Sequence, residues 1–368
     1  MPMLMESLMH KAEAGEPDAQ FELAQCYATG DGVPDDPAEA ATWYRRAAEA
    51  GHAGAALMLG GFYEQGYGVA QDEAEALRWY RCAAEAGEAD AQAILGAILL
   101  PQDEAEAVRW FDGAAEQGHA RAQVQLAHMY AAGQGVEQDD GRAAELYRRA
   151  AEGGEAAAAA CLGAGYLSGT GVEQNAAEGV RWLTIAAEGD VADAQMLLGM
   201  LYAAAEWVPR DEKRAVKWFR RAAEQGHAVA QYRLGVARHE GIGTKRNERS
   251  AARWFRAAAE QGHADAQYRL GCLLGHGQSV ARDKAEAARW YQRAAEQGVV
   301  EAQVRLAACC ALGEGTAMDR VAAYKWSTIA EAEDSSMSEL RSQLAGWMPA
   351  EDVRRAEELA RHWQPRRE

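Results

Sequence analysis

The sequence predicts an all-α solenoid of repeated helix pairs, and three observations support this prediction. Good helix formers dominate the 368 residues while Pro numbers only 8, which favours helix nearly throughout. Tryptophan and turn glycine recur with a constant spacing along the chain, which is the signature of a repeat architecture. Within each repeat, apolar residues lie four apart, as one face of a helix requires.

Tryptophan marks the repeat most clearly, and the segment AAEQGHA recurs at 114–120, 222–228 and 258–264. Leu146 takes the one place that lacks a tryptophan. The spacing is 36 residues except for one step of 31, because the third repeat lacks five residues between Leu99 and Glu104. A shorter loop is expected there. The members of the series are Trp43, Trp79, Trp110, Trp182, Trp218, Trp254, Trp290 and Trp326.

Each repeat divides into two predicted helices. The first, helix A, carries Ala, Leu and usually Tyr at every fourth place, as in Ala19, Leu23 and Tyr27. A small residue such as Gly60 follows each Leu; glycine inside a helix costs about 1 kcal/mol against alanine, so close approach of a neighbouring helix is the expected reason. A Gly-x-Gly loop such as 66–68 then ends helix A. Helix B follows, with an aromatic pair and then Ala-Ala.

Residues 15–330 are predicted to hold nine helix pairs. Neither helix alone can bury its apolar stripe, whereas stacking on neighbouring repeats does so. A short N-terminal helix is expected within 1–14. The tail at 331–368 loses the repeat spacing, and a charged helix at about 350–363 is expected to cap the open end through Leu359 and Trp363.

The pattern AAExGxxxAQxxLGxxYxxGxGV…A…WYRRAA resembles the Sel-one-like repeat (SLR) family, a relative of the tetratricopeptide repeats. The resemblance implies a right-handed superhelix of antiparallel helix pairs with a concave inner face, and an adaptor or scaffold role. The sequence departs from the pattern at Arg238, Leu274 and Cys310, which stand at helix A tyrosine places, and at 205–207, where a Gly-x-Gly loop belongs. Some members carry a disulfide in each repeat, but the six cysteines here do not follow that arrangement, so unpaired thiols are expected.

Charge is unevenly distributed along the chain. The total is −18, residues 1–184 carry −19, and residues 210–256 hold 13 basic and 5 acidic residues, which gives +8. No run of 18 apolar residues is present, so no membrane span is expected. The amino terminus lacks the features of a secretory signal, which favours a cytoplasmic location, although a chain trimmed of an export signal would read the same.

The sequence gives no reason to expect an enzyme, a catalytic residue, a cofactor or a metal. The Gly-x-Gly loops recur in nearly every repeat and lack the P-loop pattern, so they are interpreted as turns. His52, His119, His227 and His263 share one place in the repeat and are expected to open helix A rather than to bind zinc. The sequence contains neither HExxH nor GxSxG.

Positions that vary between repeats but share a face are the candidates for partner binding. The place three residues after the first Ala of helix A borders the core stripe, on what should be the concave side. It holds Arg233, Arg269 and Arg305 in successive repeats, and Met58, Ile94 and Leu197 in others. An arginine row suits an acidic or phosphorylated protein or peptide. The alternatives are arginines that are solvated or paired within their helix, and apolar residues buried against neighbours.

Three functions remain open at this point. The first is a scaffold or adaptor that clasps a protein or peptide in the concave groove, in a setting such as signalling, secretion or toxin–immunity pairing. The second is nucleic-acid binding through 210–256, which the isoelectric point of about 5.0 disfavours. The third is head-to-tail self-assembly of an otherwise monomeric chain, in which the acidic half of one copy meets the basic segment of another.

Overall fold

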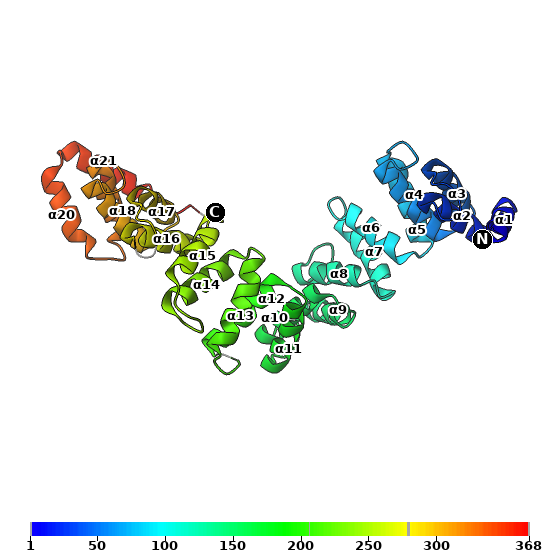
Figure 1. Ribbon diagram of the computed structural model, residues 1–368, viewed down its shortest axis with the longest axis horizontal. Coiled ribbons are helices and arrows are strands. Elements are labelled where there is room, and N and C mark those ends of the chain that lie inside the picture. The colour runs from blue at the N-terminus through cyan, green and yellow to red at the C-terminus, as the bar shows by residue number, and fades with distance from the viewer. Residues whose placement is uncertain (1, 206, 278–279, 367–368) are drawn as a thin grey trace. The chain divides into compact units, whose positions relative to one another are not determined.

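The computed structural model describes residues 2–205, 207–277 and 280–366, with side chains from residue 5 onward. The chain divides into two compact parts, the N-terminal half (Met1–Ile185) and the C-terminal half (Ala186–Glu368), and each is described by itself. Across the described ranges all regular structure is helical. Within each half the helices follow one another in chain order (Figure 1). The prediction of an all-α solenoid of helix pairs is confirmed.

In the N-terminal half, one leading helix precedes the first helix pairs. Each helix packs against the one before it, from α1 to α10. The helices are α1 (Pro2–Glu13), α2 (Pro17–Thr29), α3 (Pro37–Glu49), α4 (Ala53–Gln65), α5 (Glu73–Glu85), α6 (Ala89–Leu99), α7 (Glu104–Glu116), α8 (Ala120–Ala132), α9 (Asp140–Glu152), α10 (Ala156–Ser168) and α11 (Ala176–Glu188), whose last residues belong to the other half.

In the C-terminal half, helix pairs continue and two further helices follow them. Helices α12 to α19 pack in sequence, and both α20 and α21 pack on α19. The bounds are α12 (Ala192–Ala204), α13 (Glu212–Glu224), α14 (Ala228–Glu240), α15 (Glu248–Glu260), α16 (Ala264–His276), α17 (Lys284–Glu296), α18 (Val300–Leu312), α19 (Arg320–Ala330), α20 (Met337–Trp347) and α21 (Ala350–Arg361). Helix A of repeats 1–9 is thus α2, α4 and so on to α18, and helix B is the odd-numbered helix that follows.

An aspartate or asparagine caps the start of helix B in every repeat. The Oδ1 of Asp36, for example, accepts hydrogen bonds from the backbone N–H groups of Ala38 and Glu39, both at 3.1 Å. Such a cap satisfies amide groups that the first turn leaves unpaired, at roughly 1 kcal/mol. Sequence analysis missed this feature, although its signal is present once per repeat. The caps are Asp36, Asp72, Asp103, Asp139, Asn175, Asp211, Asn247, Asp283 and Asp319.

In most repeats the small residue in the middle of helix A receives an aromatic ring from helix B of the same repeat, whereas Gly163 receives Leu183. A Cβ on Gly60 would lie 2.6 Å from the ring of Tyr80, and a Cβ on Gly235 would lie 2.7 Å from the ring of Phe255. The predicted close approach is therefore confirmed, with the ring as its cause. The tryptophan one place earlier also belongs to the core: Trp79, for example, is 4% exposed.

Where a repeat has a Gly-x-Gly loop, the second glycine contacts the structure that precedes the repeat. A Cβ on Gly68 would lie 2.1 Å from the carbonyl oxygen of Pro37, the first residue of helix B in the preceding repeat. Gly315 meets Lys284 in the same way, at 1.9 Å. Both glycines also have a positive φ, which side-chain-bearing residues rarely adopt. The loop was expected only to end helix A, and the structure shows that it also forms an inter-repeat contact.

A buried glutamine in helix A clamps three helices together. The Gln267 Nε2 donates to the carbonyl oxygen of Ala259 at 3.2 Å, at the end of the preceding helix B. Its Oε1 accepts from the Gln297 side chain at 3.0 Å, at the end of the following helix B. We call this arrangement the glutamine clamp. It is complete at Gln92, Gln195, Gln231 and Gln267.

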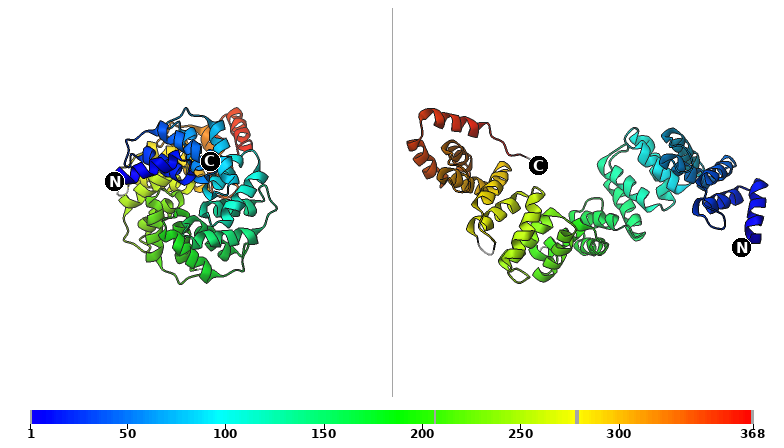
Figure 2. Two further views of the ribbon diagram at one scale, coloured as in Figure 1. Left: turned by 90° about the vertical axis from the view of Figure 1, so that its right-hand side faces the viewer. Right: turned by 45° about the horizontal axis from the view of Figure 1, so that its top comes forward.

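The tail after repeat 9 covers α19 with more structure than the sequence predicts. The charged helix expected at about 350–363 corresponds to α21, but α20 was not anticipated, because its surface is mixed and it buries only Leu344. The chain then turns back toward the preceding helices of this half (Figure 2). Trp363 packs edge-on against Trp326 with ring centroids 5.8 Å apart, and Arg366 pairs with Glu296 at 3.0 Å.

The departures from the repeat pattern have local consequences. Leu274 and Cys310 are buried at the helix A tyrosine places, while Arg238 is half-buried and its Nε has no hydrogen-bond partner. The six cysteines are free thiols. Of the segment 205–207, Glu206 lies outside the described residues. Ala205 ends α12 in the left-handed conformation with φ 59, where seven of the other eight repeats have glycine.

Replacing Ala205 by glycine should stabilise the protein. The left-handed conformation strains any residue with a Cβ, so we expect Ala205→Gly to raise the free energy of unfolding by about 0.5–1 kcal/mol. Urea denaturation followed by circular dichroism measures the change. The matched control is Ala204→Gly within α12, which should lower stability by a similar amount; a loss at both positions would contradict the strain argument.

Breaking one glutamine clamp should weaken the stack. Gln267→Met keeps the side-chain length but removes two hydrogen bonds, one to the Ala259 carbonyl and one from the Gln297 amide, at a cost of about 1–3 kcal/mol. Gln292→Met on the exposed face of α17 is the control and should stay within about 0.5 kcal/mol of the wild type. Equal urea midpoints for the two variants would show that the clamp contributes nothing.

Candidate binding surface

The three predicted arginines lie at the same place in successive A helices. Arg233 is on α14, Arg269 on α16 and Arg305 on α18. Arg233 and Arg305 are exposed, and Arg269 is half-buried. In the described part of the chain none of the three pairs with an acidic side chain, so pairing within the helix is not what occupies them. Their guanidinium groups carry positive charge that is not neutralised by a nearby carboxylate. We call these residues the arginine row.

The three predicted apolar residues occupy the same place on other A helices. Met58 on α4 is 39% exposed and Leu197 on α12 is 38% exposed, whereas Ile94 on α6 is half-buried. Met200, one turn after Leu197, is also 41% exposed. Single exposed apolar side chains are common on protein surfaces, but adjacent ones such as Leu197 and Met200 can receive an apolar partner.

Ile94 lines a cavity of about 670 Å³ among the A helices of the N-terminal half. The walls come from α4, α6, α7 and α8, and include Leu57, Leu100 and Phe111. Cavities of this size can receive a small ligand or a side chain of a partner. Sequence analysis singled out Ile94 but not the residues around it, because a cavity depends on which neighbouring side chains are small.

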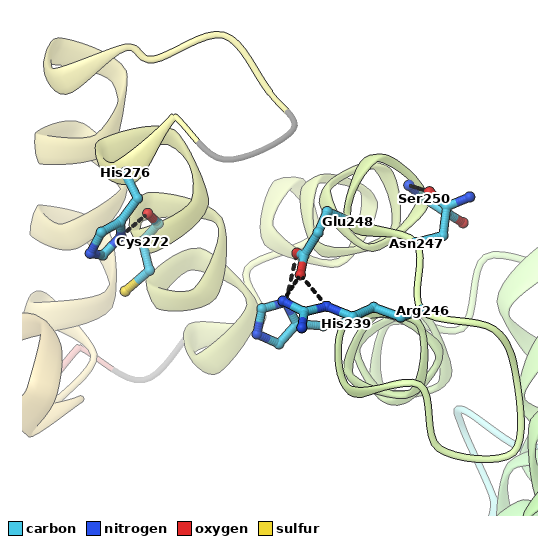
Figure 3. A network of polar contacts seen from close by, with 7 residues as sticks. All are labelled: His239, Arg246, Asn247, Glu248, Ser250, Cys272 and His276. Atoms are coloured by element: carbon cyan, nitrogen blue, oxygen red, sulfur yellow. Dashed lines mark hydrogen bonds and ion pairs between the residues drawn. The ribbon is translucent and has the colours of Figure 1, made fainter.

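The basic segment at 210–256 uses much of its charge within the protein. Glu248 accepts hydrogen bonds from His239 at 2.7 Å and from Arg246 at 2.6 and 2.9 Å (Figure 3). Burial by itself raises the pKa of Glu248, but these hydrogen bonds outweigh it and hold the pKa below its ordinary value. Five of the 13 basic residues form such ion pairs: Arg210, Arg214, Arg221, Arg246 and Arg256.

The four histidines in the shared repeat position cap helix A, as predicted. In each, Nδ1 accepts a hydrogen bond from the backbone N–H three residues later; the His119 Nδ1, for instance, lies 3.1 Å from the Ala122 nitrogen. An imidazole can accept in this way only while that nitrogen is unprotonated. The pKa of His263 lies below its ordinary value. Burial is the largest cause of this shift, and the positive charge of Arg233 lowers the pKa further.

A stack of antiparallel helix pairs, joined by repeat-to-repeat contacts and presenting variable side chains along helix A, defines an α-solenoid repeat protein. The chain belongs to the Sel1 repeat family, whose model matches nine segments: 17–52, 53–88, 89–119, 120–155, 158–191, 192–227, 228–263, 264–299 and 300–334. Sel1 repeat proteins are generally scaffolds for protein interaction. The described part of the chain contains no helix long and apolar enough to cross a membrane.

Two solved structures resemble this chain over most of its length. One is a protective antigen of uropathogenic Escherichia coli strains that displays an SLR fold; it shares 31% identity, with 97% of this chain and 94% of that one covered and a TM-score of 0.66. The other is a Sel1 repeat protein from Oxalobacter formigenes, also 31% identical, with 82% and 89% covered and a TM-score of 0.63. Among curated proteins no match is found.

Replacing His263 by asparagine should flatten the dependence of stability on pH. Asparagine also caps helices but does not titrate. Because the folded state lowers the pKa of His263, the wild type must lose stability as the pH falls below about 6.5, the value in the unfolded chain. We therefore expect the stability of wild type relative to His263→Asn to decrease between pH 8 and pH 5.5 in urea titrations. Parallel pH profiles would contradict the assignment.

Proposed function

We propose that this protein is a non-catalytic scaffold that holds a protein or peptide partner along its A helices, in the concave groove that the family resemblance implies. The observation that carries the proposal is the arginine row: three arginines at one place in successive repeats, without an acidic partner in the described part of the chain. Packing of the repeat core does not require arginine at this place of helix A, because Glu22 and Gln125 occupy it in other repeats. A variable position on a constant framework is where partner specificity can differ.

The chemistry of the arginine row favours an acidic or phosphorylated segment. Guanidinium groups bind carboxylates and phosphates through two parallel hydrogen bonds. Neighbouring A helices of a helical stack are spaced by roughly 10 Å, so an extended acidic peptide that crosses them can meet one arginine after another. The apolar residues Met58, Ile94 and Leu197 would then receive apolar side chains of the partner.

Nucleic-acid binding is the weaker alternative. A nucleic-acid surface needs basic side chains that are free to replace counterions on the phosphates. In 210–256, ion pairs, including those with Glu212, Glu248 and Glu286, already hold five of the 13 basic side chains. The remaining positive charge on this segment belongs to a chain whose net charge is −18, which disfavours approach to a polyanion.

Reversing the arginine row should abolish partner capture without unfolding the protein. The partner is first identified by affinity purification and mass spectrometry. The triple variant Arg233→Glu, Arg269→Glu, Arg305→Glu is then expected to bind that partner at least about 100-fold more weakly, which is about 2.7 kcal/mol, with an unchanged helical signal in circular dichroism.

The matched control places the same charge change on helix B. Lys217, Arg253 and Arg289 are exposed at one shared place in the same part of the stack, directly before the helix B tryptophan. Changing these three to Glu should leave binding within a fewfold of the wild type. Binding that survives the arginine-row variant, or that falls equally in the control, would refute the proposed binding surface.

A further inference from the structure

One place in helix A holds an aromatic ring in three repeats, as Phe21, Tyr232 and Tyr268. In the two of these repeats that are followed by a histidine cap, the ring is stacked on that histidine. Phe21 in repeat 1 lies over His52 with ring centroids 4.3 Å apart and an interplanar angle of 20°. Tyr232 in repeat 7 lies over His263 at 4.5 Å and 26°. In both repeats the ring also contacts the aromatic residue of helix B, at 5.8 Å in repeat 1 and 6.0 Å in repeat 7. The fold therefore forms a slot for a ring between these two partners.

Repeat 3 keeps both walls of this slot but lacks the ring. The histidine is His119 and the helix B aromatic residue is Phe111, but the place between them holds Ala93. Ala93, Phe111 and His119 all line the cavity of about 670 Å³. In the other three repeats that are followed by a histidine cap, this place holds Phe21, Met196 or Tyr232. The cavity thus includes the space that a larger side chain fills elsewhere in the same protein.

The histidine wall is held in place for stacking. The His119 Nδ1 accepts from the Ala122 N–H at 3.1 Å, and its Nε2 lies 3.2 Å from the Asp90 carboxylate. Contacts at both nitrogens fix the ring, so that little side-chain freedom is lost when a second ring stacks on it. The rest of the wall is largely apolar, with Leu57 and Ile94 on one side.

We propose that this cavity binds an aromatic side chain of the protein partner, which stacks on His119 against Phe111 as Phe21 and Tyr232 do in their own repeats. This inference rests on the proposed scaffold function and specifies one anchor residue of the partner. An aliphatic side chain would fill part of the volume but would lack the ring-on-ring contact that the two filled repeats show, since aromatic pairs gain energy beyond the area they bury.

Stacking of an aromatic ring on His119 in this cavity can be tested with small probe molecules before any partner is known. The probes are p-cresol and N-acetyl-tyrosinamide, with N-acetyl-leucinamide as the aliphatic comparison, and the readout is the NMR signal of the histidine ring protons. The aromatic probes should shift the His119 signal in a saturable way, while His52 and His263, whose faces are already covered, should not respond. The leucine probe should bind at least about tenfold more weakly. His119→Asn assigns the signal.

Two variants make the result decisive. Ala93→Phe places the repeat 1 ring in the cavity, so it should abolish the response of His119 to p-cresol while leaving the urea midpoint equal or higher. Phe21→Ala removes the ring in repeat 1 and should make His52 responsive. The inference is overturned if the aromatic probes do not shift His119, if Ala93→Phe responds like the wild type, or if the leucine probe binds equally well.

The natural partner separates this inference from the proposed function. If the identified partner is lost with the arginine-row variant and weakened at least about tenfold by Ala93→Phe, both stand. If Ala93→Phe binds the partner as the wild type does, the aromatic anchor is wrong and the scaffold function remains. If the arginine-row variant still binds while Ala93→Phe does not, the arginine surface is wrong and the anchor remains.

Discussion

The structure depends on a buried or half-buried glutamine that seven of the nine A helices offer to the neighbouring helices. The glutamine clamp satisfies a carbonyl group at the end of the preceding helix and, where helix B of the same repeat is followed by a suitably placed Gln, the amide of that second glutamine. Apolar contacts between helices are largely non-directional, whereas these hydrogen bonds have a defined geometry. Where the clamp is present, it therefore fixes the register with which a helix pair stacks on its neighbour, while the side chain over the small helix A residue sets how close the two helices of the pair can come.

Because the clamp, the ring and the loop glycine determine the stack, other positions are free to differ. Arg233, Met58 and Ile94 occupy one such place on their helices, and the place held by Phe21 and Ala93 is a second one that lies partly inside the stack. Under the proposed function, the first place would offer a partner charge and the second would offer a ring-sized cavity, each within its own half of the chain.

Much of the fold could be predicted because the repeat compares the protein with itself. The helix pairs, the small residue after each Leu and the capping role of His52 all follow from spacing. What could not be predicted depends on contacts between residues far apart in sequence: Gly68 meets Pro37 of the preceding repeat, and Gln267 meets Gln297 at the other end of its own repeat. The arginine row could be located on its helices, yet the cavity beside Ile94 could not, since its existence depends on the absent side chain at Ala93. Helix α20 was missed because it lacks the repeat pattern altogether.

The loop glycine has a consequence for how such a chain can change its length. Gly68, Gly135, Gly171, Gly243 and Gly315 each approach the first residue of the previous helix B, so these five repeats make the same contact with the repeat before them. Duplication or loss of a complete repeat in the gene would bring together two surfaces that already fit. Insertion of part of a repeat would not bring together two matching surfaces. This geometry therefore favours growth of the chain by complete repeats.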